Sequence, residues 1–131
     1  MFAEDTIRYV RAHVEGVTGI ALPYTIDVVS GDGLAVRLEN DRAQIAAQDE
    51  NALARGFFLL SRCAKEGKNA LDVCQKRHFS SCGVMADVSR NAVLTLDAVR
   101  RLIDHLACLG MNMLMLYTED TYEIETQPFF G

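Results

Sequence analysis

Apolar residues in the first half of the chain recur with two different periods. Within residues 4–15 they fall three and four positions apart, as on one face of a helix: Ile7, Val10 and Val14. Further on, every second residue is apolar in three short runs, at 24–29, 34–39 and 43–47, and most of the residues between them are polar or small. Alternation of this kind is typical of strands with one buried face, and turn residues separate the runs. The pattern predicts a helix followed by a three-stranded meander.

A second helical pattern predicts a cover for the apolar face of this sheet. Asp49 suits the N-cap of the helix and Gly67 suits the position just after its end. Between them runs an apolar stripe: Leu53, Phe57, Leu60 and Ala64. Gly56 lies inside the helix, where glycine costs about 1 kcal/mol relative to alanine. We therefore expect Gly56 to face a strand at close range.

The second half of the chain has the pattern of a strand, a helix and a second strand. An apolar run at 83–88 precedes a helix that begins after Thr95 and ends at Gly110, and a second apolar run follows at 111–117. Short connections between such elements imply a right-handed parallel crossover.

The predicted fold class is α+β, with a small meander sheet covered by helices and then a βαβ unit. The first domain spans residues 1–67 and the βαβ unit spans 82–131. Residues 68–81 have weak periodicity and mixed charge, so they are interpreted as a connector with room for a short helix or strand.

Composition fits a globular chain and argues against some classes of partner. Of 131 residues, 50% are hydrophobic and 24% are charged, which allows a core. The net charge of -5 argues against a nucleic-acid surface. Charged residues interrupt any secretory pattern at the N-terminus, and no run reaches the roughly 18 apolar residues of a membrane-spanning helix. We expect a cytoplasmic protein with no nucleic-acid or membrane partner.

Cysteine and histidine spacing predicts neither a metal site nor a disulfide framework. The four cysteines lack paired C-x2-C spacing, so reduced thiols are expected: Cys63, Cys74, Cys82 and Cys108. The histidines show no nucleophile–base arrangement. The glycines form neither a phosphate loop nor a dinucleotide fingerprint, so no cofactor is expected.

Charged side chains follow both predicted parallel strands. Asp87 ends the first strand and Arg90 stands in the turn after it, while Glu119 and Asp120 follow the second strand. Parallel strands present functional groups at their C-terminal ends, so we expect these residues at one mouth, with Arg90 within ion-pair reach of an acid. Spacing alone leaves two interpretations open, which are substrate binding and a structural ion pair.

At these residues the chain resembles the opening of the catalytic barrel of glycoside hydrolase family 20, the β-N-acetylhexosaminidases. Residues 83–90 match G-x-M-x-D-x-S-R, the helix carries L-x-x-L-x-x-N, and the second strand ends in T-E-D. The resemblance covers residues 82–131 densely. The sequence ALARGFFLL at 52–60 resembles more loosely the small α+β domain that precedes such barrels.

The resemblance implies a retaining exo-enzyme that removes terminal β-linked N-acetylhexosamine from glycosides. In this family the substrate's own acetamido oxygen attacks the anomeric carbon, so no protein nucleophile is needed. An adjacent Asp-Glu pair orients the acetamido group and protonates the leaving oxygen, and it lies after the fourth barrel strand. Glu119-Asp120 is a different pair, on the second strand.

The expected object is therefore an N-terminal fragment of a truncated barrel with no catalytic residue of its own. A full barrel takes about 250 residues. The resemblance implies four candidates for substrate binding, which are Asp87, Arg90, Glu119 and Asp120. Many family members carry a sugar-binding Arg where this chain has Cys82, and Arg90 is the nearest substitute.

A second class of function competes with the enzyme fragment. The chain could be a non-catalytic α+β module that binds carbohydrate or protein and oligomerises through its C-terminal strands. Those strands are apolar on both faces, and open apolar edges tend to pair with other chains. This interpretation predicts a homodimer.

Overall fold

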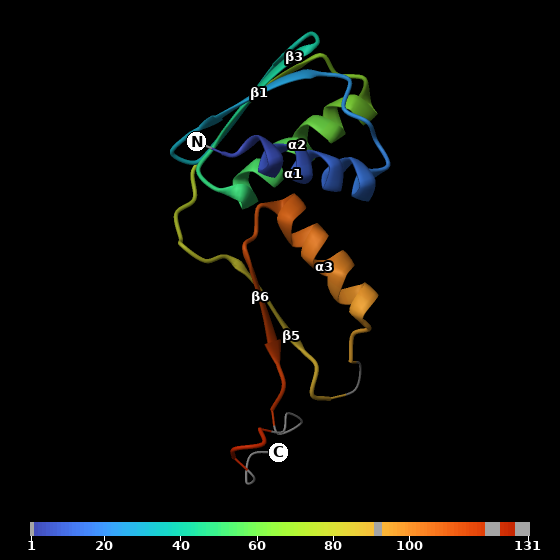
Figure 1. Cartoon of the computed structure of the whole chain (residues 1–131), viewed down its shortest axis with the longest axis vertical. Coiled ribbons are helices and arrows are strands. Elements are labelled where there is room, and N and C mark those ends of the chain that lie inside the picture. Colours follow the sequence, from blue (N-terminus) through green and yellow to red (C-terminus); the bar gives the residue numbers. More distant parts are fainter. Residues whose placement is uncertain (1, 91–92, 120–123, 128–131) are drawn as a thin grey trace.

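The computed structural model describes residues 2–90, 93–119 and 124–127. The described elements follow one another in this order: α1 (Glu4–Thr18), β1 (Thr25–Ser30), β2 (Leu34–Glu39), β3 (Arg42–Ala47), α2 (Glu50–Glu66), β4 (Ala70–Gln75), β5 (Gly83–Asp87), α3 (Leu96–Leu109) and β6 (Met113–Tyr117). In Figure 1, α1 and α2 lie between the first four strands and the βαβ unit formed by β5, α3 and β6. The predicted α+β class is confirmed.

The order of strands in the first sheet differs from the predicted meander. Among the described residues this sheet has the order β1-β3-β2-β4, in which β1 pairs parallel with β3 and β2 pairs antiparallel with β3. The loop between β1 and β2 does not close a hairpin. Instead, the amide of Gly31 donates to the carbonyl of Ala47 at 2.9 Å, and the amide of Gln48 donates to the carbonyl of Gly33 at 2.8 Å. Through these bonds the β1–β2 loop crosses the end of β3, so β1 and β2 pair with opposite edges of β3.

Part of the predicted connector, residues 68–81, belongs to the first sheet. Strand β4 pairs antiparallel with β2, in a register that aligns Val36 with Val73 and Leu38 with Leu71. Leu71 and Val73 are only half-buried. The apolar alternation of β4 is too weak to predict a strand from the sequence, and its pairing with β2 identifies it.

The hydrophobic core lies between this sheet and the two helices beside it. Helix α2 packs against β2 and β3, and α1 packs beside α2. A Cβ atom on Gly56 would lie 2.8 Å from Cγ2 of Ile45 and 3.4 Å from Cδ1 of Leu34. The expectation that Gly56 faces a strand is therefore confirmed. The largest fully buried apolar side chains are Phe57, Leu38, Ile45, Leu53, Leu60, Val14 and Val36.

The predicted N-caps of the later helices are also confirmed. The carboxylate of Asp49 accepts a hydrogen bond from the amide of Ala52 at 2.8 Å, and the hydroxyl oxygen of Thr95 accepts one from the amide of Ala98 at 3.2 Å. Each bond satisfies a backbone N–H that the first helical turn leaves unpaired. None of the helices in the described part has the length and apolar character needed to cross a lipid bilayer.

The βαβ unit has its predicted parallel pair but little core of its own. Strands β5 and β6 run in register from Gly83 opposite Met113 to Asp87 opposite Tyr117. A side chain at Gly83 would collide with the backbone of Met113, which accounts for the glycine that opens β5. No further strand pairs with either one in the described ranges. A single parallel pair with its helix is common to many α/β folds, and its strands ordinarily have both faces covered.

The two units are joined through the connector and the N-terminus of α2. Arg77 donates to Asp49 at 2.7 Å and to the side-chain oxygen of Asn51 at 3.1 Å. The amide nitrogen of the Asn51 side chain donates to the carbonyl of Met111, just before β6, at 2.7 Å. Partial burial acts to raise the pKa of Asp49, but the hydrogen bonds from Arg77 and the Ala52 amide outweigh it and lower that pKa. The connector is thus tied to both units.

Helix α3 is tied to both helices of the first unit. The imidazole of His13 on α1 donates to the carboxylate of Asp104 at 2.8 Å. The guanidinium of Arg55 on α2 donates to the carbonyl of Cys108 near the end of α3. These contacts fix the orientation of the βαβ unit and therefore of the strand ends that it carries.

We predict opposite effects of alanine at two helical glycines. Gly16→Ala should raise the free energy of unfolding by up to about 1 kcal/mol, because no atom lies within 4 Å of the added Cβ. Gly56→Ala gains the same helix propensity, but its Cβ overpacks Ile45, which costs about 2 kcal/mol. The net effect should be a free energy of unfolding lower by about 1 kcal/mol. Urea denaturation of both variants measures the difference. Equal stabilisation by the two alanines would contradict the close packing at Gly56.

Candidate functional site

The C-terminal ends of β5 and β6 bring together three of the four predicted site residues. Arg90 lies with Nη2 at 2.6 Å from Oε1 of Glu119 and with Nε at 3.7 Å from Oδ2 of Asp87. The register places Asp87 opposite Tyr117, so the segments after both strands leave the sheet at the same edge. The predicted meeting of Asp87, Arg90 and Glu119 is confirmed. Asp120 lies outside the described residues.

A tight turn after β5 orients Asp87. Its Oδ1 accepts hydrogen bonds from the amide of Ser89 at 2.9 Å and from the hydroxyl of Ser89 at 2.6 Å. This is the Asx-turn arrangement, in which a short acidic side chain closes the backbone bend behind it. The turn returns the chain so that Arg90 reaches across to β6. Asp87 therefore has a structural role in the turn and keeps Oδ2 toward Arg90.

Ser89 and Tyr117 also belong to this cluster, although neither was among the predicted site residues. The phenol of Tyr117 donates to Oε1 of Glu119 at 3.1 Å. The hydroxyl of Ser89 lies 3.5 Å from Oε2 of Glu119. Ser89 could have been predicted as a site residue, because it is part of the motif G-x-M-x-D-x-S-R. The contact of Tyr117 with Glu119 could not, because it depends on the turn that the chain makes after β6. We define Asp87, Ser89, Arg90, Tyr117 and Glu119 as the strand-end cluster.

Electrostatics keep the acids of the strand-end cluster ionised. Hydrogen bonds from the side chain and the backbone of Ser89 lower the pKa of Asp87. The hydrogen bond from Arg90, followed by that from Tyr117, lowers the pKa of Glu119. The same bond to Glu119 and the nearby charge of Asp87 raise the pKa of Arg90.

Such a cluster can bind polar groups but is poorly suited to donate a proton. An ionised carboxylate only accepts hydrogen bonds, whereas a general acid near neutral pH needs a raised pKa. The side chains of Asp87, Arg90 and Glu119 are partly exposed, so a ligand can reach them. Carboxylate acceptors beside a guanidinium donor match the hydroxyl groups of a sugar.

The remaining predicted features lie away from the cluster. Cys82 precedes β5 and is therefore at the opposite end of that strand, where its amide donates to the side chain of Asn112 at 2.9 Å. All four cysteines lie in the described part and are free thiols. Within residues 2–90, 93–119 and 124–127, no three His, Cys, Asp or Glu side chains gather as a metal site requires.

Comparison of the chain with protein-family models and with curated protein sequences finds no match.

We predict that Arg90→Gln raises the pKa of Glu119 toward the value of an ordinary glutamate. The reason is that Arg90 is the main cause of the lowered pKa. Since that pKa is lowered in the fold, the pair stabilises the fold above the ordinary carboxyl pKa, and its contribution is lost as the pH falls through the lowered value.

Carboxyl NMR titration of the variant measures this change. Arg100→Gln is the matched control, because Arg100 also pairs with an acid three residues away on the same unit, at 3.0 Å from Asp97. It should leave Glu119 unchanged. An unaltered titration of Glu119 in Arg90→Gln would contradict the pairing described above.

Proposed function

We propose that residues 82–131 are the opening of a glycoside hydrolase barrel and that the strand-end cluster forms part of its sugar-binding mouth. One observation carries the proposal. Side chains from two adjacent parallel strands converge at the C-terminal ends, where (β/α)8 enzymes bind their substrates. The enzyme class is a retaining exo-β-N-acetylhexosaminidase, as the resemblance to glycoside hydrolase family 20 implies.

The chemistry of the cluster supports a carbohydrate ligand. Glu119 and Asp87 are acceptors for sugar hydroxyl protons, and Arg90 donates to hydroxyl oxygens. Hydrogen bonds to ionised groups are roughly twice as strong as neutral ones, so a few of them orient a neutral sugar. Asp120 directly follows Glu119 and stays a candidate for the same mouth.

In this proposal the cluster binds and the chemistry occurs elsewhere in a complete barrel. The acetamido oxygen of the substrate attacks the anomeric carbon while a carboxylic acid protonates the leaving oxygen. The lowered pKa values of Asp87 and Glu119 are unsuited to that acid. The Asp-Glu pair that orients and protonates would come from a later strand.

The 131-residue chain alone should have no hexosaminidase activity. Its Asp49-Glu50 pair lies at the N-terminus of α2 and not after a fourth barrel strand, where the substrate-assisted step requires an Asp-Glu pair. Its two parallel strands also enclose no sugar. The assay is release of a chromophore from an N-acetyl-β-glucosaminide, compared with the heat-inactivated chain. Turnover above that background would refute the assignment of binding alone to these residues.

The proposal predicts that the gene encodes the rest of the barrel after Gly131, and it is tested in that longer protein. That protein should hydrolyse the N-acetylglucosaminide. Arg90→Gln should lower kcat/KM by about 10- to 100-fold, the effect of losing a hydrogen bond to a charged group. Arg100→Gln serves as control and should be neutral. Absence of activity, or equal activity of both variants, would contradict the proposal.

A second candidate function is a binding module that oligomerises through β5 and β6. The observation in its favour is the exposure of apolar side chains on these strands, including 63% for Met85, 49% for Met115 and 47% for Leu116. Met85 and Met115 are partners in the register and share one face of the strand pair, while Leu116 lies on the other face. Exposed apolar side chains that share a face usually mark an interaction site.

We predict that the 131-residue chain forms a homodimer through β5 and β6. Light scattering at micromolar concentration should give twice the monomer mass of 14.5 kDa. Met115→Lys should restore the monomer, because a charge on this surface opposes its burial. Tyr9→Lys is the control, at a more exposed hydrophobic position on α1, and should leave the dimer intact.

The longer protein separates the two candidate functions. In an enzyme barrel the following strands and helices cover β5 and β6, so no dimer should form through this surface in the longer protein. Met115→Lys should then lower the free energy of unfolding, because it buries an unpaired charge. In an oligomerising module the dimer persists and still depends on Met115. A monomeric 131-residue chain would contradict the module.

A further inference from the structure

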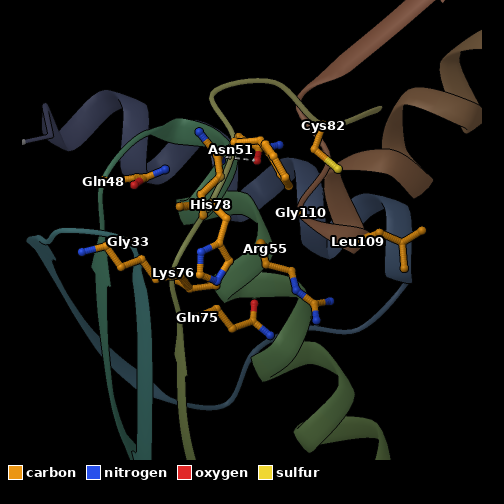
Figure 2. Close-up of a pocket in the computed structure, with 14 residues that line it drawn as sticks. Gly33, Gln48, Asn51, Arg55, Gln75, Lys76, His78, Cys82, Leu109 and Gly110 are labelled. Carbon is orange, nitrogen blue, oxygen red and sulfur yellow. Dashed lines mark hydrogen bonds between the residues drawn. The ribbon is translucent and has the colours of Figure 1, made fainter. Parts of the chain in front are cut away.

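A cavity of about 260 Å³ lies where the βαβ unit meets the first unit. Figure 2 shows the side chains that line it, which come from the start of β2, the first turns of α2, the end of β4 with the connector, and the end of α3. Its lining includes Cys82 and Gly110, which precede β5 and β6. The cavity is thus at the opposite strand ends from the strand-end cluster. Its volume is just below the roughly 300 Å³ at which ligand sites usually begin, so it suits a small ligand.

The charged side chains that line the cavity are basic. Arg55, Lys76 and Arg77 line it, and no aspartate or glutamate does so among the described residues. The chain as a whole has a net charge of -5. A basic concavity in an acidic chain concentrates anions there, because low-dielectric walls focus the field of the cations.

These three cations differ in how fully their charge is compensated. Arg77 is paired with Asp49 at 2.7 Å. Lys76 pairs with Asp32 at 3.1 Å, but both side chains are largely exposed, so this pair contributes little and exchanges readily with another anion.

Arg55 is the cation whose charge has no acidic partner among the described residues. Its Nη1 donates to the carbonyl of Cys108, and its Nε is buried without a hydrogen-bond partner. A buried polar atom of this kind is uncommon and requires a physical explanation. The carbonyl of Cys108 is neutral and does not balance the positive charge of Arg55. An anion beside the guanidinium would balance it.

The other walls of the cavity favour a flat apolar body. Leu34, Ala52 and Leu109 line it with aliphatic groups, and Phe79 adds an aromatic ring that is 75% exposed. An exposed phenylalanine at the rim of a cavity offers a face for stacking. His78 completes this side, and Figure 2 shows it among the residues around the cavity.

We propose that this cavity binds a small aromatic anion, a carboxylate or a phosphate monoester on a flat ring. The anionic group lies at Arg55 and Lys76, and the ring lies between the aliphatic wall and Phe79. Because both units contribute to the cavity, the ligand stabilises their contact by binding the assembled form. This site is independent of the proposed sugar site.

The test is a titration of the ¹⁵N-labelled chain with phenyl phosphate, followed by amide NMR. Saturable shifts are expected for Cys82, Gly110 and Ala52, with a dissociation constant of about 1 mM or tighter. Phenol is the matched neutral probe and should shift none of them at the same concentration. Benzoate distinguishes the anion, since tighter binding of benzoate assigns a carboxylate and weaker binding assigns a phosphate.

Variants separate the anion contact from the ring contact. Arg55→Met should raise the dissociation constant of phenyl phosphate at least about 10-fold, which corresponds to a loss of about 1.4 kcal/mol of binding free energy. Since Arg55 also holds α3, Phe79→Ala is the second variant. Phe79 is exposed and outside the core, so its loss should weaken binding about 3-fold or more without changing the unfolding midpoint. Arg62→Met, on the exposed face of the same helix, should bind normally.

Three results would overturn the proposal. The first is the absence of saturable shifts at these amides up to about 10 mM phenyl phosphate. The second is equal binding of phenol, which would reduce the site to an apolar cavity. The third is unaltered binding in both Arg55→Met and Phe79→Ala.

Discussion

The packing of α2 is the interaction on which both halves of the chain depend. Its Gly56 side lies against β2 and β3 closely enough to exclude a Cβ, and this contact closes the only large core in the described part. Its N-terminal turn holds the connector through Asp49 and holds the start of β6 through Asn51. Arg55, on the same helix, holds the end of α3. The position of the βαβ unit, and of both candidate sites, follows from these contacts.

The two units differ in how their structure is maintained. The first has a core of fully buried side chains from two helices and a sheet. In the second, Leu106 is the buried residue of α3, and β5 and β6 expose apolar side chains. Parallel strands ordinarily have both faces covered, so this unit lacks most of its expected packing. The strand-end cluster is therefore held by a tight turn and ion pairs. In the proposed enzyme, a surrounding barrel would add the rigidity that a binding site requires.

Local chemistry made much of the structure predictable, and long-range pairing made the rest inaccessible. The boundaries of α2 follow from Asp49 and Gly67, and the close approach at Gly56 follows from a glycine that is costly inside a helix. Asp87 and Glu119 could be placed together because parallel strands end at one edge. The partner of β1 could not be predicted, because alternation reports which face is buried and not which strand lies beside it. The basic cavity was equally hidden, since its walls come from segments far apart in sequence.

Hydrogen exchange of the 131-residue chain, followed by mass spectrometry below the concentration at which it dimerises, tests the central claim most directly. We propose that β5 and β6 belong to a larger sheet, whereas the first unit packs its own core. Strong protection is expected for the amides in β2 and β3. Exchange in β5 and β6 should be at least about 100-fold faster, because local opening there exposes little additional apolar surface. Equal protection of the two sheets in the monomer would contradict it, since the βαβ unit would then be satisfied within this chain.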